Sequence, residues 1–149
     1  MNQKDIDLNT LVVLVIDDDA MVRDILIDYL KLFGFQRIIS ARNASTAMPI
    51  IQDAKQHLDL IISDWEMPGG DGLSVLQAVR KNPMRTGLRF MMVTSQNSME
   101  RSKISRAAKW KVDAYLIKPF RGEIFKQKVF EVLAAPPADG GSDDKKKVG

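Results

Sequence analysis

Polar residues follow four apolar runs of the chain, each at the point where the run ends. In chain order they are Asp17 with Asp18, then Asp64, Thr94 and Lys118. In an open parallel α/β sheet, ligands bind beyond the carboxyl ends of the strands, so residues that are distant in sequence meet there. We therefore expect acids, a hydroxyl group and a lysine to form one site.

The three carboxylates of Asp17, Asp18 and Asp64 would repel one another unless something neutralised them. A hard divalent cation with oxygen ligands is the usual solution, and Mg²⁺ fits best because it binds one or two carboxylates together with water and phosphate oxygens. The lack of cysteine and the single histidine, His57, argue against zinc. The sequence predicts a Mg²⁺ site, against the alternative that each aspartate is merely a solvated residue at a strand end.

A lysine and a threonine beside such a metal describe a phosphoryl site. Lys118 would supply a positive charge and Thr94 a hydrogen-bond donor. Phosphoryl transfer requires mostly positioning and charge neutralisation, so an aspartate beside Mg²⁺ can act as the nucleophile and become an acyl phosphate. We assign this role to Asp64, which stands alone at its strand end, whereas the pair of Asp17 and Asp18 suits metal binding.

The elements that must position these residues alternate regularly along the chain. Strands are expected at residues 11–16, 36–40, 58–63, 88–93 and 114–117, and helices at 20–33, 44–54, 71–81, 98–109 and 121–134. Unbroken Val, Ile and Leu runs alternating with short helices indicate a parallel sheet covered on both faces, which is a doubly wound α/β fold. Pro49, inside the second helix, predicts a kink or a later helix start.

Length and composition favour one domain, from residue 8 to 134, and a disordered tail over residues 135–149. The lack of cysteine, of a signal peptide and of a membrane-spanning run favours the cytoplasm and no membrane insertion.

Residues 100–128 carry nine Lys or Arg against three Asp or Glu. This local excess is either a solvated helix face or a surface for an acidic partner or nucleic acid.

Several segments together resemble the receiver domains of two-component response regulators, most of all the stand-alone chemotaxis type. They are Leu14-Val15-Ile16-Asp17-Asp18 with Arg23, Ile62-Ser63-Asp64-Trp65-Glu66-Met67-Pro68, Asp71-Gly72-Leu73, Met92-Val93-Thr94 and Tyr115-Leu116-Ile117-Lys118-Pro119-Phe120. The resemblance covers nearly all of residues 11–133. It implies a flavodoxin-like sheet of five parallel strands in the order 2-1-3-4-5, with five helices.

The resemblance also implies a role for each matching residue at the metal and the phosphate. Asp17 and Asp18 would be the acidic pair at Mg²⁺, and Asp64 would accept a phosphoryl group from a histidine kinase. Glu66 would contribute its backbone carbonyl to the metal, and Lys118 would contact the phosphate. The protein would then be a phosphoacceptor rather than an enzyme, with at most self-phosphorylation from small donors and autodephosphorylation.

Signal output would follow from a switch at Thr94 and Tyr115. Thr94 would bind the phosphate, and Tyr115 would move into the vacated space, so the face of the fourth helix, fifth strand and fifth helix would repack and control binding of a target protein. The peptide bond between Lys118 and Pro119 would be cis, as in the family. A chemotaxis output is favoured, with a phosphorelay receiver or a phosphorylation-independent docking scaffold as alternatives.

Three residues depart from the family pattern. Glu66 would hang over the phosphate entrance, and Gln96 would bind the attacking water without acting as a strong base, so we expect slow to intermediate autodephosphorylation. Trp110 is either a partner anchor or a half-buried structural residue.

A phosphohydrolase with an Asp nucleophile remains an alternative, although no insertion could build a substrate cap. Residues after Ala135 could not form a DNA-binding helix-turn-helix, so nucleic acid is not an expected partner.

Overall fold

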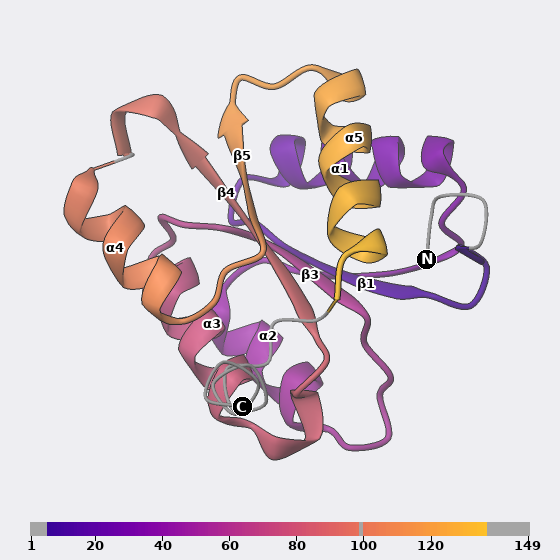
Figure 1. Cartoon of the computed structure of the whole chain (residues 1–149), viewed down its shortest axis with the longest axis horizontal. Helices are drawn as coiled ribbons and strands as arrows, with labels where there is room; N and C mark the ends of the chain where they lie inside the picture. Colours follow the sequence, from indigo (N-terminus) through magenta and orange to yellow (C-terminus); the bar gives the residue numbers. More distant parts are fainter. Residues whose placement is uncertain (1–5, 99, 137–149) are drawn as a thin grey trace, which may run out of the picture.

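The computed structural model describes residues 6–98 and 100–136. Its five strands form one parallel sheet in the predicted order, β2-β1-β3-β4-β5 (Figure 1). The strands are β1 (Val12–Ile16), β2 (Arg37–Ala41), β3 (Leu60–Asp64), β4 (Arg89–Ser95) and β5 (Ala114–Lys118). The helices are α1 (Ala20–Phe33), α2 (Ala44–Gln52), α3 (Gly72–Lys81), α4 (Arg101–Lys109) and α5 (Gly122–Ala134), with short 3₁₀ turns η2 (Pro83–Arg85) and η3 (Gln96–Ser98).

The sheet separates two hydrophobic clusters. Helices α1 and α5 cover one face, and α2, α3 and α4 cover the other (Figure 1). Successive side chains of a strand point to opposite faces, so Val13 of β1 packs beneath α1 and α5 whereas its neighbour Leu14 packs beneath α2 and α3. Because both faces are covered, the carboxyl edge of the sheet is left as the place where loops can form a site.

Local signals set the ends of α1, which lies directly after the first acidic pair. The Asp19 side chain accepts hydrogen bonds from the backbone N–H groups of Met21 and Val22 and so caps the start of the helix. Gly34 ends the helix in the left-handed conformation, with φ of 117°. The capped helix start therefore holds the loop that carries Asp17 and Asp18.

Of the two effects expected from Pro49, a later start of α2 does not occur. The helix begins at Ala44, because Asn43 and Thr46 form a capping box in which each side chain accepts a hydrogen bond from the backbone N–H of the other. Pro49 lies inside the helix, which ends at Gln52, two residues before the predicted end.

Several strands extend further than the sequence pattern indicated. Asp64 and Lys118 are the last residues of β3 and β5, and Thr94 lies within β4. Helix α4 begins at Arg101 rather than at residue 98, because residues 96–98 form the turn η3. The site residues are therefore held by the sheet itself more firmly than loop residues would be.

In the described part of the chain, no helix is long and apolar enough to cross a membrane. Helix α5 ends at Ala134, and the predicted disordered tail lies outside the described residues apart from Ala135 and Pro136.

Candidate functional site

Three aspartates come together at the carboxyl edge of the sheet. Asp17 follows β1, Asp18 is the next residue, and Asp64 ends β3. One carboxylate oxygen from each lies within 4.8 Å of the other two. Asp17 and Asp64 are buried, whereas Asp18 is exposed. The structure thus brings together the three residues that the sequence singled out for a metal.

Asp17 is fixed from several sides. Its Oδ1 accepts a hydrogen bond of 2.9 Å from the Asp19 backbone N–H, and its backbone carbonyl accepts one of 2.7 Å from the guanidinium of Arg23. Its Oδ2 is buried, accepts no hydrogen bond from the described residues, and lies 3.7 Å from the Lys118 Nζ. Burial raises the pKa of this carboxyl above its usual value.

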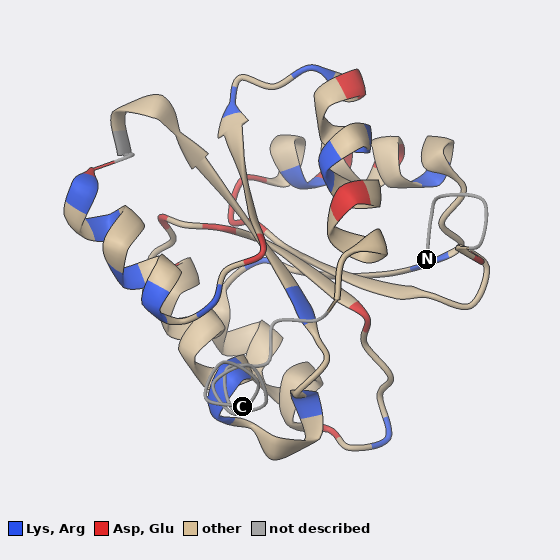
Figure 2. Cartoon of the chain, in the orientation of Figure 1, with Lys and Arg blue, Asp and Glu red and all other residues tan. Residues whose placement is uncertain are grey.

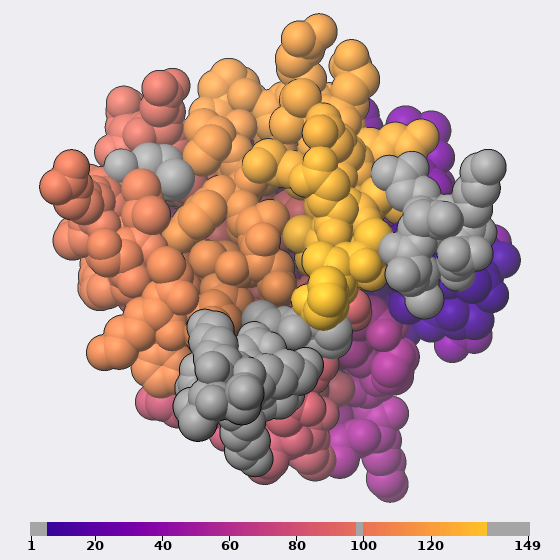
Figure 3. All heavy atoms as spheres, viewed as in Figure 1, coloured from indigo at the N-terminus to yellow at the C-terminus, as the bar shows by residue number. Residues whose placement is uncertain are grey.

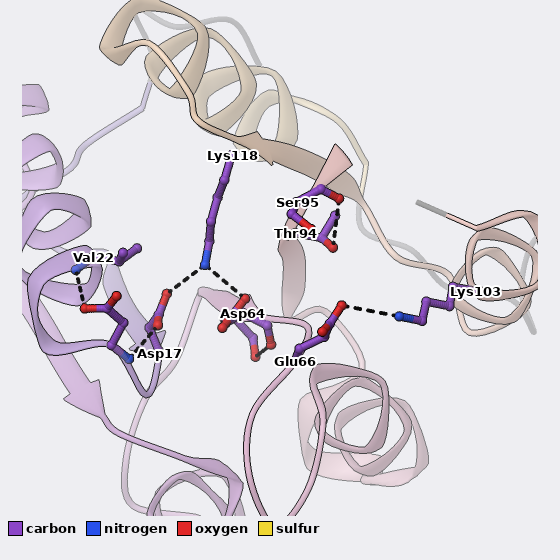
Figure 4. Close-up of polar contacts among 10 residues, drawn as sticks. Asp17, Val22, Asp64, Glu66, Thr94, Ser95, Lys103 and Lys118 are labelled. Atoms are coloured by element: carbon purple, nitrogen blue, oxygen red, sulfur yellow. Dashed lines mark hydrogen bonds and ion pairs between the residues drawn. The ribbon is translucent and has the colours of Figure 1, made fainter. Parts of the chain in front are cut away.

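Asp64 lies beside Lys118, as Figure 4 shows. The Lys118 Nζ donates a hydrogen bond of 3.2 Å to the Asp64 Oδ1. Burial and then the negative charge of Asp17 raise the pKa of Asp64, and the charge of Lys118 lowers it, with a net result of about 6. The lysine bridges the two buried acids but only partly offsets their mutual repulsion.

This arrangement fits a hard divalent cation. The Asp17 Oδ2 is a buried carboxylate oxygen that lacks a hydrogen bond from the described residues, and a third carboxylate, from Asp18, reaches the same point from the solvent side. Mg²⁺ takes oxygen ligands and keeps several waters, so a half-open group of carboxylates suits it. The donor set contains no nitrogen or sulfur, which zinc would favour.

A cleft of about 150 Å³ opens beside Asp64. It is lined by Asp64, Glu66, Thr94, Ser95 and Lys118. Thr94 is buried, and its hydroxyl points to the backbone carbonyl of Ser95 at 3.5 Å (Figure 4). The sequence analysis gave Ser95 no role; its position next to Thr94 was the one available signal.

Glu66 lies at the entrance of the cleft, where the sequence analysis expected it. Its side chain is 60% exposed, and its Oε1 lies 3.4 Å from the Nζ of Lys103 on α4. From the sequence, Lys103 is only one of the nine basic residues in the excess over residues 100–128. Nothing in the sequence pairs two residues that belong to different elements and lie 37 positions apart.

The cleft connects to α4 through a pair of stacked aromatic rings. Trp65, which follows Asp64, is buried, and its ring is nearly parallel to that of Tyr115 on β5, with 6.3 Å between centroids. The Tyr115 hydroxyl donates a hydrogen bond of 3.4 Å to the Ile104 carbonyl on α4. The predicted switch tyrosine therefore touches both the loop after Asp64 and the helix expected to move.

The remaining predictions concern residues at the edges of the site or away from it. The peptide bond between Lys118 and Pro119 is cis. Gln96 is exposed in η3 and does not line the cleft. His57 is largely exposed and pairs with Asp59. Trp110 is half-buried against the hydrophobic cluster beneath α2, α3 and α4, and the Lys81 Nζ lies 5.2 Å from its ring centre. This position favours a structural role for Trp110 over a role as a partner anchor.

Comparisons with known proteins agree on one family. Residues 13–130 match the model of the response regulator receiver domain. The probable chemotaxis protein CheY of Rhizobium etli is 37% identical over 123 residues, which cover 83% of this chain and 92% of the relative. The chemotaxis protein CheY of Pseudomonas aeruginosa is 32% identical over 121 residues, which cover 81% of this chain and 94% of the relative.

Solved structures give the same result. A putative response regulator from Chloroflexus aurantiacus superposes with a TM-score of 0.75 at 28% identity, covering 84% of this chain and 98% of that one. The chemotaxis protein CheY4 of Vibrio cholerae superposes with a TM-score of 0.74 at 25% identity, covering 83% and 98%.

Proposed function

The chain belongs to the response regulator receiver domain family, and from this premise we propose that Asp64 accepts a phosphoryl group from a histidine kinase while Mg²⁺ is bound at the acidic site. Proteins of this family are phosphorylation-activated signalling switches rather than conventional enzymes. The observation that supports the proposal most is the convergence of Asp17, Asp18, Asp64 and Lys118 at the carboxyl ends of three strands.

In the proposed transfer, a carboxylate oxygen of Asp64 attacks the phosphorus of a phosphohistidine. A P–O bond forms and the P–N bond breaks; the imidazole nitrogen keeps the bonding electrons and takes up a proton. With a small acyl phosphate as donor, the carboxylate of the donor leaves with the electron pair instead. The Asp64 carboxylate borders the cleft, so a donor can approach it from solvent.

The charges around Asp64 match the needs of this transfer. Lys118, already hydrogen-bonded to the Asp64 carboxylate, would contact the incoming phosphoryl group and offset its negative charge. Mg²⁺, held by Asp17, Asp18, Asp64 and the Glu66 carbonyl, would neutralise charge on the phosphoryl oxygens. The buried Asp17 Oδ2 supports this assignment, because it accepts no hydrogen bond from the described residues and a cation would provide a closer partner than Lys118 at 3.7 Å.

We propose that Thr94 and Tyr115 convert phosphorylation into a change of surface. The Thr94 hydroxyl now points to the Ser95 carbonyl, and a phosphoryl group on Asp64 would offer it a stronger acceptor across the same cleft. Movement of Thr94 would free space for the Tyr115 ring, which would break its hydrogen bond to Ile104 and loosen α4.

The resulting output surface would be the α4-β5-α5 face, which Figure 3 shows directly as neighbouring orange and yellow regions. A target protein would bind there, and a chemotaxis-like output is supported by the names of the relatives.

We propose residues 8–134 as the functional domain, because Leu8 packs against the α1 and α5 cluster and α5 ends at Ala134. The proposed location is the cytoplasm, where a kinase has access to ATP.

Trp65 provides the test, because it adjoins Asp64 and is stacked on Tyr115. Its fluorescence is followed during titration with Mg²⁺ and then with beryllofluoride, a stable mimic of the phosphoryl group. Both proteins compared, the reference and the Asp64→Asn variant, carry Trp110→Phe so that a single tryptophan reports.

We expect Mg²⁺ to change the fluorescence of the reference protein and beryllofluoride to change it again. Only the first change, weakened, should remain in the Asp64→Asn protein. A metal response without any beryllofluoride response in the reference protein would contradict the phosphoacceptor assignment and favour a docking scaffold.

A further inference from the structure

The entrance of the cleft carries a negative charge close to the attacking carboxylate. Glu66 lines the same cleft as Asp64 and stands two positions after it. Every natural phosphoryl donor is an anion, so an uncompensated carboxylate at this point would repel it. Asp17, Asp18 and Asp64 already place three carboxylates beside the cleft. Whether the charge of Glu66 is neutralised therefore determines how strongly the site repels an incoming anion.

Lys103 supplies that compensation. Its Nζ lies 3.4 Å from the Glu66 Oε1 and 5.9 Å from the centre of the Trp65 ring. The ring face attracts the ammonium group, so the lysine has two partners that fix its position. Only 21% of the Lys103 side chain is exposed, whereas the Glu66 side chain is 60% exposed. The more buried lysine therefore contacts the more exposed glutamate.

The contact with Lys103 also fixes the direction in which the Glu66 carboxylate points. Figure 4 shows the Glu66 carboxylate reaching toward Lys103 of α4, on the opposite side of Glu66 from Asp64. Figure 2 shows basic residues along the length of α4. Among the described basic residues of this helix, Lys103 alone forms an ion pair. Lys103 is thus the residue of α4 that contacts Glu66 at the entrance of the cleft.

We propose that Lys103 is a positioning residue that keeps Glu66 neutralised and turned away from the cleft, and thereby determines how well the site accepts anionic phosphoryl donors. This inference rests on the proposed function of Asp64. An ion pair whose carboxylate is 60% exposed adds little to stability, so the effect belongs to the rate of phosphorylation rather than to folding. The effect should be larger for donors with more negative charge.

The test compares two small donors, acetyl phosphate and the less negatively charged phosphoramidate, by following the rate of the Trp65 fluorescence change in excess Mg²⁺. Lys103→Met should lower the second-order rate constant for acetyl phosphate by roughly three- to tenfold at low salt. The loss for phosphoramidate should be smaller. Raising the salt concentration should reduce the loss, because screening weakens the repulsion by Glu66.

Three further variants separate charge from structure. Lys103→Arg should keep near wild-type rates, and Glu66→Gln combined with Lys103→Met should recover most of the lost rate, because no charge remains to be neutralised. Lys109→Met removes the same charge from the exposed end of α4 and should leave the rates nearly unchanged. Titration with Mg²⁺ shows that each variant retains a folded site.

The outcomes distinguish this inference from the function on which it rests. If wild-type protein accepts phosphate from neither donor, the proposed function fails and the inference fails with it. If wild-type protein reacts but Lys103→Met reacts equally well, the inference alone is wrong. A loss that is equal for both donors and insensitive to salt would indicate a structural role for Lys103 and would also overturn it.

Discussion

At Asp64, burial and charge act against the ionised form that the chemistry needs. The pKa of this carboxyl is raised from 3.8 to about 6, so keeping it ionised at neutral pH destabilises the metal-free fold. We expect Asp64→Asn to increase the free energy of unfolding at pH 7.5 without Mg²⁺ by roughly 1–3 kcal/mol. Urea denaturation measures this difference. A less stable Asp64→Asn protein would contradict the electrostatic account of the site.

The same gain should depend on pH in a defined direction. A carboxyl with a raised pKa binds its proton more tightly in the folded than in the unfolded chain, so it favours folding as the pH falls from above 6 toward 3.8. Asparagine does not titrate. The advantage of Asp64→Asn over wild type should therefore shrink across this window. The exposed Asp28 on α1, changed to Asn, is a control that should show no comparable gain.

Glu66 should also affect how long the phosphoryl group survives. Glu66 lines the cleft through which water reaches Asp64, and the bulk of its side chain hinders that approach. Glu66→Asn keeps a polar side chain but removes the charge and shortens it. We expect autodephosphorylation to become roughly several-fold faster, because a smaller side chain leaves water a wider path and its amide can hydrogen-bond that water. Decay of the Trp65 signal after donor removal measures the lifetime, and an unchanged lifetime would exclude this role.

At the level of elements, the start of α3 holds β3 in place through a close contact. A side chain at Gly72 would lie 2.5 Å from the Asp64 carbonyl oxygen and 2.6 Å from the Met92 sulfur. We expect Gly72→Ala to destabilise the fold by roughly 1–3 kcal/mol, because the strand end or the helix must shift, and to weaken Mg²⁺ binding. At Gly87 no atom lies within 4 Å of the added carbon, so Gly87→Ala is the matched control. Equal stability of the two variants in thermal unfolding would refute the close-contact argument.

The elements also show where prediction from sequence succeeds. The bounds of α1 were predicted correctly, because local signals, Asp19 and Gly34, determine both ends. The start of α2 at Ala44 agrees with the predicted range, and the later start suggested by Pro49 does not occur, because the capping box of Asn43 and Thr46 determines this end of the helix. The acids of the site were identified because strand ends converge in a parallel sheet. The pairing of Lys103 with Glu66 was not, because it depends on how α4 packs and has no local signal.

For the molecule as a whole, metal binding and folding should be linked. A ligand that binds only the folded chain stabilises it by mass action, by about 2.7 kcal/mol at a concentration 100 times its Kd. We expect the melting temperature of the wild-type protein to rise with Mg²⁺ concentration. Asp17→Asn should abolish most of the rise, because it removes the buried carboxylate oxygen that lacks a hydrogen bond from the described residues. Na⁺ at matched ionic strength is the control, and an equal rise with Na⁺ would exclude a specific site.

The division of the core by the sheet has an evolutionary consequence. Leu30 of α1 and Leu76 of α3 are both fully buried, yet they belong to clusters on opposite faces. Substitutions at such a pair should combine additively, because distant sites without shared partners are energetically independent. A lineage could therefore exchange the residues beneath α1 and α5 without compensating changes beneath α3. Sequence drift in the cluster on one face of the sheet would leave the residues of the cluster on the other face unchanged.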